Sequence, residues 1–281
     1  MRVLFTGGSS KLGGAVLERL LGSPEISEAW CAVHRSKVLA ASPKVRLFPW
    51  DTTPAPSVDL LVHFAGLTHS PADGAYWDVN LKGTRRLVDQ ARAAGCRRMV
   101  YISTRCAARG SGAYGESKKA AEDYVLSLSW ESLLIVRPAE VYGAASREGV
   151  DRFIALARKF HAVPLLFGHP GLRFAPIHAR DFTAVCAELI LSHRSGVKTV
   201  ELCGPEALSG AGLALRIARR HRALPIPVWW PALSAAARLA AAVGLPFLAS
   251  DQLTRTVGPK SAQESSLDPA LSGEMTLFPE D

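Results

Sequence analysis

The chain opens on an apolar strand, a glycine-rich turn and an amphipathic helix in direct succession. The segment VLFTGGSSKLGGAVLERL (3–20) passes through a turn that begins at Gly7 and enters a helix whose aliphatic side chains share one face. Such a helix offers backbone N–H groups and the positive end of its dipole to a phosphate. Gly7 permits the tight turn and Gly13 permits close helix-to-sheet packing, while Ser10 replaces the middle glycine of G-x-x-G-x-x-G and could add a hydroxyl donor. Glycine turns also make plain strand-to-helix connections, but this position in the chain favours dinucleotide binding.

Apolar runs typical of strands alternate with helical patterns along most of the chain. The strand-like runs cover residues 2–6, 29–35, 45–51, 59–66, 97–104, 133–138 and 199–204. Helix-period segments lie between them at about 12–21, 76–94, 113–128, 179–193 and 209–222. Runs that are apolar throughout, rather than alternating, suit parallel strands buried on both faces.

This order predicts an α/β fold with a doubly wound parallel Rossmann sheet and a small C-terminal substrate-binding lobe. We expect a Rossmann-type NAD(P)-binding domain over residues 1–205, with a lobe insertion at about 144–178, and the C-terminal lobe over residues 206–281. Prolines and glycines loosen the pattern after Pro138, as expected for segments that close over a ligand at the carboxyl ends of the strands.

Charge and cysteine usage narrow the class of protein. The net charge is +8, but the basic residues are spread thinly, and their one concentration, RIARRHR (216–222), resembles a solvated helix end. We therefore expect a small-molecule substrate and no nucleic-acid partner. No apolar run is long enough to span a membrane and the N-terminus begins on strand-like sequence, so we expect a cytoplasmic protein with no membrane partner. The five cysteines are scattered without metal-ligand spacing, which indicates reduced thiols and no metal site.

The residues after the second strand distinguish the two nicotinamide cofactors. An acidic side chain there would bind the ribose 2′-hydroxyl and repel a 2′-phosphate, but this strand ends in His34-Arg35-Ser36. A guanidinium pairs with phosphate through charge-assisted hydrogen bonds, and Lys11 in the glycine turn could add a second cation. The sequence thus favours NADP over NAD, although Arg35 could also be a plain exposed loop residue.

A tyrosine and a lysine one helical turn apart form the candidate catalytic pair. In GAYGESKKAAEDYVLSL (112–128), Tyr114 and Lys118 project from the same face of a helix. A free phenol has a pKa of about 10, and a neighbouring ammonium favours its ionised form. Such pairs are usually only surface residues, but this one opens the helix that follows a strand ending in Ser103-Thr104, whose hydroxyls can hydrogen-bond a substrate oxygen. We expect Tyr114 to transfer a proton while the cofactor transfers a hydride.

With these motifs, the chain resembles an extended short-chain dehydrogenase/reductase of the NAD-dependent epimerase/dehydratase family over roughly residues 1–205. TGGSSKLG resembles TGGxGxxG, VNLKGT (79–84) resembles VNxxGT, YGESK resembles YxxxK, and RPAEVYG (137–143) resembles the stretch that flanks the nicotinamide. Asp51-Thr52 resembles the acidic residue that holds the adenine, and HFAG (63–66) the segment behind the cofactor. The resemblance implies a homodimer formed through the helices at 76–94 and 113–128, with Thr104 as the catalytic hydroxyl.

The motifs and the resemblance together give the candidate site. The catalytic residues are Thr104, Tyr114 and Lys118; the substrate residues are Ser103, Thr104 and Arg173, although Arg173 could equally pair with a neighbouring acid. The cofactor-binding residues are Gly7, Gly8, Ser9, Ser10, Lys11, Leu12, Gly13, His34, Arg35, Ser36, Asp51, Thr52, Phe64, Ala65, Gly66, Asn80, Tyr114, Lys118, Pro138, Ala139 and Val141.

Two departures from the family pattern leave the substrate open. Only nine residues separate Thr104 from Tyr114, where sugar-nucleotide enzymes have a longer loop, and Ala139-Glu140 replaces a stretch that often carries an asparagine. The leading hypothesis is an NADP-dependent reductase acting at a carbonyl or secondary alcohol, on a nucleotide sugar or another compound. The alternatives are a nucleotide-sugar epimerase or dehydratase with bound NAD, and a non-catalytic cofactor-binding scaffold or redox sensor.

Overall fold

The computed structural model describes residues 1–33, 42–51, 54–144, 149–242, 250–261, 266 and 275–278. At its centre lies a seven-stranded sheet in which every neighbouring pair of strands is parallel. Its strands are β1 (Arg2–Thr6), β2 (Glu28–Val33), β3 (Val45–Pro49), β4 (Leu60–His63), β5 (Arg98–Ile102), β6 (Ser132–Pro138) and β11 (Gly196–Leu202). The strand order is β11-β6-β5-β4-β1-β2-β3, which reverses between β1 and β4. The predicted doubly wound parallel Rossmann sheet is confirmed.

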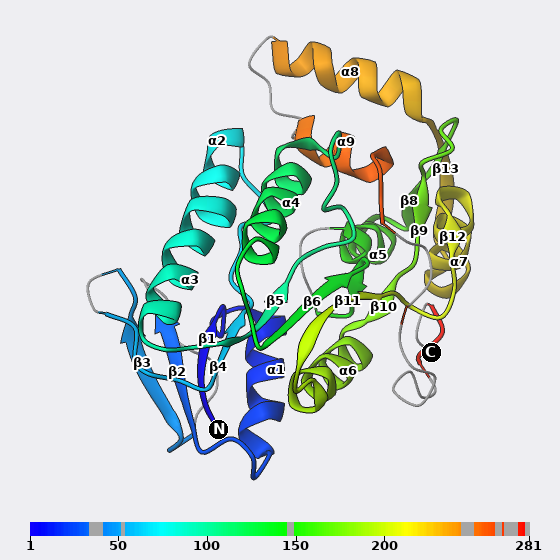
Figure 1. The fold of residues 1–281 in the computed structure, drawn as a ribbon. Coiled ribbons are helices and arrows are strands. Elements are labelled where there is room, and N and C mark those ends of the chain that lie inside the picture. The colour runs from blue at the N-terminus through cyan, green and yellow to red at the C-terminus, as the bar shows by residue number, and fades with distance from the viewer. Residues whose placement is uncertain are drawn as a thin grey trace.

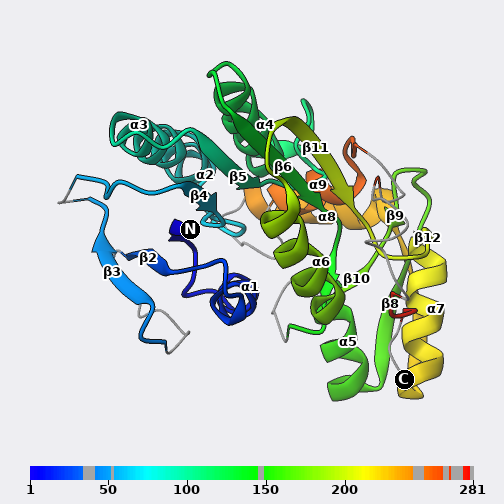
Figure 2. The ribbon, with the colours of Figure 1, turned by 60° about the horizontal axis from the view of Figure 1, so that its bottom comes forward.

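Helices cover both faces of this sheet (Figures 1 and 2). One face carries α1 (Lys11–Gly22) and α6 (Ala179–Ser192); the other carries α2 (Asp73–Tyr76), the π-helical segment η1 (Trp77–Gly83), α3 (Thr84–Ala93) and α4 (Gly112–Leu126). The side chains of successive strand residues point to opposite faces of the sheet. Phe5 packs against residues of α1 and α6, and Leu4 packs against residues of α3 and α4. Burial on both sides explains why the strands are apolar throughout.

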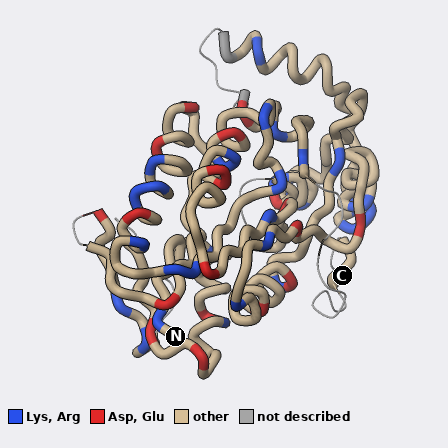
Figure 3. Tube along the Cα trace, in the orientation of Figure 1, with Lys and Arg blue, Asp and Glu red and all other residues tan. Residues whose placement is uncertain are grey.

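A smaller lobe is assembled from two separate parts of the chain. It contains β7 (Val141–Tyr142), α5 (Gly149–Phe160), β8 (Ala162–Phe167), β9 (Arg173–Phe174), β10 (Ile177–His178), β12 (Leu208–Ser209), α7 (Gly210–His221), β13 (Leu224–Trp229), α8 (Trp230–Ala242) and α9 (Ser250–Val257). β13 pairs with β8 and β12 with β9, and Val163 and Ile217 share one core cluster, so the two parts pack as one body. Figure 3 shows charged residues on most helices, whereas α8 carries only Arg238.

One helix differs from its sequence prediction. The pattern predicts a single helix over 76–94, but residues Trp77–Gly83 wind as a π-helix between α2 and α3. π-helical turns inside α-helices are frequent at functional sites. This one contains Asn80, which the family resemblance places at the cofactor.

Candidate active site

The glycine turn joins β1 to α1 in a conformation that requires glycine. Gly7 has a φ of +80°, and a Cβ there would lie 2.8 Å from the backbone nitrogen of Ala65. A Cβ at Gly13 would lie 2.3 Å from the Gly7 carbonyl oxygen, so Gly13 is required by the turn itself rather than by helix-to-sheet packing. The turn therefore sits tightly against the loop after β4, at the reversal of the strand order.

Ser10 has a structural task in this turn. Its Oγ accepts a hydrogen bond from the Gly13 N–H at 3.0 Å and donates one to the Gly7 carbonyl at 2.9 Å. It is thus the N-cap of α1, and its hydroxyl proton is already used. The hydroxyl that the sequence suggested as an extra phosphate donor is committed to the cap instead.

A buried chain of hydrogen bonds supports the loop after β4. Thr6 Oγ1 accepts from the N–H groups of Phe64 and Ala65, at 3.1 and 3.0 Å, and lies 2.8 Å from His63 Nδ1. His63 Nε2 lies 2.8 Å from Thr84 Oγ1, which donates to the Asn80 carbonyl at 2.6 Å. Burial, with the nearby Lys118 charge, lowers the pKa of His63 to about 3. The imidazole is therefore neutral, and the consistent arrangement has Thr6 donating to Nδ1 and Nε2–H donating to Thr84.

Asn80 ties this loop to the candidate catalytic helix. Its Oδ1 accepts from the Leu67 N–H at 2.7 Å, and its Nδ2 donates to the Leu67 carbonyl and the Ser117 hydroxyl, each at 3.1 Å. Ser117 Oγ donates in turn to the Tyr114 carbonyl at 2.8 Å. These bonds fix the loop after β4 relative to the first turns of α4, where the candidate catalytic pair lies.

Lys118, the second member of that pair, is buried. Only 4% of the residue is exposed, its Nζ donates to the Ile102 carbonyl at 2.8 Å, and it lies 4.3 Å from the centre of the Tyr101 ring. Burial lowers the pKa of Lys118 to about 7, although the Glu122 carboxylate one turn further along α4 opposes this. The amine therefore titrates in the neutral range.

Thr104 and Tyr114 face a common cavity of about 700 Å³. Cys106, Pro138, Ala139 and Val141 also line it, whereas Ser103 does not. The Ser103 hydroxyl is buried, with no hydrogen-bond partner among the described residues. Of the two residues, only Thr104 lines the cavity; its catalytic role and the substrate role of Ser103 stay predictions.

Arg105 and Glu140, which both line the cavity, form an ion pair in its wall. Arg105 is 1% exposed, and its Nη2 donates to both Glu140 carboxylate oxygens at 2.8 Å. Burial alone would raise the pKa of Glu140, but Arg105 and Lys260 outweigh it and hold the pKa below its usual value. Glu140 stands at the position where the family often has an asparagine. Its ion pair with Arg105 holds the segment after β6 in place.

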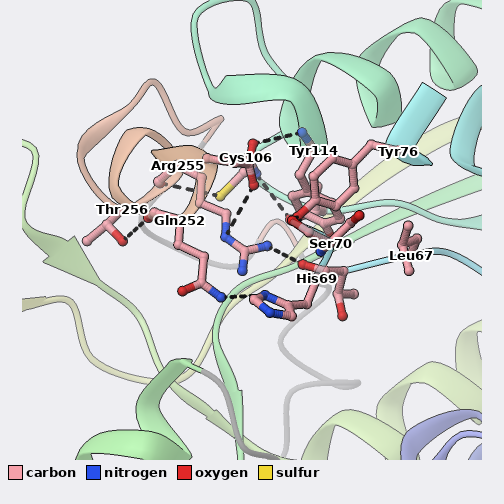
Figure 4. Close-up of polar contacts among 12 residues, drawn as sticks. Leu67, His69, Ser70, Tyr76, Cys106, Tyr114, Gln252, Arg255 and Thr256 are labelled. Atoms are coloured by element: carbon pink, nitrogen blue, oxygen red, sulfur yellow. Dashed lines mark hydrogen bonds and ion pairs between the residues drawn. The ribbon is translucent and has the colours of Figure 1, made fainter. Parts of the chain in front are cut away.

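Helix α9 is the part of the site that the sequence did not reveal. Asp251 accepts from the Tyr114 N–H at 2.9 Å, and the Arg255 guanidinium lies 5.0 Å from the centre of the Tyr114 ring. Arg255 also donates to the Thr68 carbonyl at 2.7 Å, and Gln252 hydrogen-bonds His69 at 2.7 Å (Figure 4). The helix thus bridges the loop after β4 and the start of α4.

The short link between Thr104 and Tyr114 packs directly against this helix. A Cβ at Gly112 would lie 2.5 Å from the Asp251 carboxylate, and the Ser111 hydroxyl donates to the Pro259 carbonyl at 2.8 Å. Residues Gln252, Leu253, Arg255 and Thr256 line the cavity where a longer loop would otherwise reach it. A C-terminal helix therefore closes the side of the cavity that the short link leaves open.

The remaining predicted residues divide into three groups. Asp51 follows β3, and its carbonyl accepts from Arg86 at 2.7 Å. Arg173 is exposed and is not among the cavity-lining residues, while its carbonyl accepts from Arg105 and Lys260; its substrate role stays a prediction. His34, Arg35, Ser36 and Thr52 lie outside the described residues.

The site fits a nicotinamide dinucleotide. The N-terminus of α1, the Gly7 turn and the loop at Ala65 meet at the strand reversal where such ligands bind. A Cβ at Gly66 would lie 3.7 Å from Lys118 Nζ and 3.3 Å from Asn80 Oδ1, so the glycine leaves open the space that these two polar groups face. Within the described ranges, no cluster of three or more His, Cys, Asp or Glu could hold a metal ion, and no helix could cross a membrane.

Several solved structures share this fold. MoeE5, solved with UDP-glucose and NAD, has a TM-score of 0.66 at 19% identity, over 82% of this chain and 85% of that one. The dTDP-glucose 4,6-dehydratase DesIV of Streptomyces venezuelae, with bound NAD, has a TM-score of 0.66 at 19% identity, over 82% and 84%. A UDP-galactose 4-epimerase has a TM-score of 0.62 at 19% identity, over 92% and 97%. At these identities the likeness establishes the fold alone.

A parallel sheet with a glycine turn at its strand reversal and a Tyr/Lys helix beside it defines an NAD(P)-dependent enzyme of the short-chain dehydrogenase/reductase type. The chain belongs to the NAD-dependent epimerase/dehydratase family, whose model matches residues 3–203. A ceramide reductase of Caulobacter vibrioides is 33% identical over 130 residues, which are 46% of this chain and only 40% of that protein.

Proposed function

We propose that the chain is an NADP-dependent reductase acting at a carbonyl or the corresponding secondary alcohol. One observation carries the proposal: Thr104 and Tyr114 line the same cavity, and Lys118 is buried one helical turn from Tyr114. The 33% identity to a ceramide reductase supports reduction over epimerisation.

The residues would divide the chemistry as follows. The bound cofactor supplies a hydride to the carbonyl carbon. Thr104 donates a hydrogen bond to the carbonyl oxygen, and the Tyr114 hydroxyl gives its proton to that oxygen as it becomes an alcohol. The Lys118 ammonium stabilises the resulting phenolate and holds the ribose. The neutral His63 and Asn80 hold the loop after β4 in a fixed position relative to α4.

The preference for NADP depends on Arg35, the second residue after the end of β2. The residues directly after this strand, His34-Arg35-Ser36, include no carboxylate that would repel a 2′-phosphate. We expect Arg35→Ala to raise the KM for NADPH by about 10- to 100-fold, the value of a charge-assisted pair with a phosphate, and to leave the KM for NADH unchanged. Steady-state kinetics with both cofactors measures this. Arg19→Ala, at an exposed position on α1, is the control and should change neither constant. A wild-type protein that prefers NADH would contradict the assignment.

A nucleotide-sugar epimerase or dehydratase is the second candidate, favoured by the NAD and nucleotide sugars in the related solved structures. Such an enzyme recycles its cofactor and would not oxidise NADPH in net amounts. Protein that purifies with tightly bound NAD, and that interconverts a nucleotide sugar without consuming NADPH, would favour this candidate.

We also propose that the chain acts in the cytoplasm as a homodimer joined through the helices at 76–94 and 113–128, which correspond to η1, α3 and α4. Exposed aliphatic side chains beside these helices, Val79 at 45% and Leu126 at 44%, support a partner on this face. We expect light scattering on the eluting protein to give twice the chain mass of 30.1 kDa. A mass equal to one chain at micromolar concentration would contradict the dimer.

A further inference from the structure

The cavity beside the candidate catalytic residues extends into the lobe, where its walls are apolar. Helix α5 contributes Phe153 and Leu156, strands β8 and β13 contribute Leu166 and Val228, and helices α8 and α9 contribute Leu233 and Leu253. These side chains come from five elements, so the apolar character belongs to the whole extension rather than to one wall. The volume of about 700 Å³ covers the whole cavity, including the part lined by the predicted cofactor residues Leu12, Pro138 and Ala139 as well as the lobe extension.

The charges of the cavity are poorly suited to a nucleoside diphosphate. Among the described lining residues the cations are Arg105, Arg152 and Arg255. Arg105 is paired with Glu140, and Arg255 donates to the Thr68 carbonyl and lies over the Tyr114 ring. Arg152 is exposed on α5. A diphosphate drawn into this space would be desolvated without a cluster of cations to replace its water.

Three of the lobe elements that border the cavity, β8, β13 and α8, carry almost no charge. Strands β8 and β13 contain no Asp, Glu, Lys or Arg, and α8 contains Arg238 alone (Figure 3). The chain as a whole is basic, with a net charge of +8, so the scarcity of charge is a local property of β8, β13 and α8. Uncharged walls that border a reactive hydroxyl suit an aliphatic chain attached to the reacting carbon.

We propose that the substrate is a ketone or aldehyde bearing a long unbranched aliphatic chain, whose carbonyl lies at Thr104 and Tyr114 and whose chain fills the lobe extension of the cavity. This inference rests on the proposed carbonyl reductase function and names its substrate class. Because burial of each methylene contributes about 0.8 kcal/mol, kcat/KM should rise about threefold to fourfold for each added methylene until the cavity is full.

A homologous series of 2-alkanones tests the proposal, each assayed below its micelle-forming concentration. NADPH oxidation gives kcat/KM, and calorimetric titration of the NADPH-loaded protein gives Kd for the same compounds. We expect both to improve with chain length and then level off. Leu233→Gln should lower kcat/KM for the longest chains at least tenfold and leave the shortest alkanone unchanged. Leu239→Gln is the matched control, since Leu239 lies on the same helix, is 68% exposed and does not line the cavity.

The outcomes separate this inference from the function on which it rests. Turnover of short carbonyls without chain-length dependence, or tighter binding of UDP-glucose than of any alkanone, would overturn the aliphatic substrate while the reductase function stands. Failure of every carbonyl to oxidise NADPH would count against the reductase function. In that case the calorimetric series still decides the inference, because a Kd that does not fall with chain length would refute it.

Discussion

Replacing Tyr114 with phenylalanine is expected to lower kcat for carbonyl reduction by roughly 10²- to 10⁴-fold, the usual contribution of a positioned proton donor. The change removes only the hydroxyl. The ring keeps its edge-on contact with Tyr76 at 5.9 Å and its place beneath Arg255, and its backbone N–H still donates to Asp251. We therefore expect the affinity for NADPH, measured by cofactor fluorescence, to stay within about twofold of the wild type.

Tyr124→Phe is the matched control for this experiment. Tyr124 lies on the same helix, where its hydroxyl donates to Asp89 far from the cavity lining. Its loss should leave kcat unchanged. If Tyr114→Phe oxidised NADPH as fast as the wild type, Tyr114 would not be the proton donor, and the catalytic assignment would fail with it.

The sheet could be predicted from the sequence because its signals are local. Each of the strands β1, β4, β5 and β6 contains a run of consecutive apolar residues, such as Leu61 and Val62 of β4, whose side chains pack in opposite layers. Gly7 marks the first turn because no other residue tolerates its positive φ and its contact with Ala65. Tyr114 and Lys118 are one turn apart, so their common face follows from helix geometry alone.

The closure of the cavity could not be predicted, because it depends on contacts between distant parts of the chain. Asp251 and Tyr114 are separated by 137 positions, and Arg255 and Thr68 by 187. Neither α9 residue stands in a recognisable motif, so nothing in the local pattern distinguishes them from ordinary surface charges. The sequence indicates this closure only indirectly. The link between Thr104 and Tyr114 has only nine residues, so another segment of the chain has to cover that side of the cavity.

The N-cap role of Ser10 does not follow from the sequence, for a related reason. A hydroxyl in place of glycine has the right chemistry for a phosphate ligand and for an N-cap, and sequence alone does not rank the two. In the structure the Ser10 hydroxyl makes two hydrogen bonds within the turn, to the Gly7 carbonyl and from the Gly13 N–H, which are those of an N-cap. The π-helical turn at Asn80 was equally hidden, because its side chain bonds to Leu67 and Ser117 are tertiary contacts that a helical periodicity does not encode.

The second large effect is expected at Lys118. Lys118→Met should lower kcat/KM by at least about 10³-fold, because the proposed function assigns to Lys118 both the charge that stabilises the Tyr114 phenolate and the donor that holds the ribose. The same change should make the cofactor-free protein more stable at neutral pH. A lysine whose pKa falls from 10.5 to about 7 on folding is held at a cost in free energy, and methionine of similar length removes that cost.

The sign of the pH dependence follows from proton counting. Between pH 7 and 10.5 the unfolded chain keeps the Lys118 proton and the folded protein has lost it, so the stability of the wild type rises with pH in this window. Below pH 7 both states are protonated and the full cost is present. The stabilisation by Lys118→Met should therefore be larger at pH 6 than at pH 10, by roughly 3–4 kcal/mol.

Denaturant unfolding at a series of pH values measures this difference, on protein free of cofactor because a bound ligand would add its own stabilisation. Lys119→Met is the matched control, since Lys119 is the next residue on α4, its side chain is 34% exposed, and it pairs with Asp123 at the surface. Its stability curve should run parallel to that of the wild type, and its kcat/KM should be unchanged. If the Lys118→Met curve were also parallel, Lys118 would titrate normally in the folded protein. The stability prediction would then be wrong, and the catalytic prediction for Lys118 would depend on the measured kcat/KM alone.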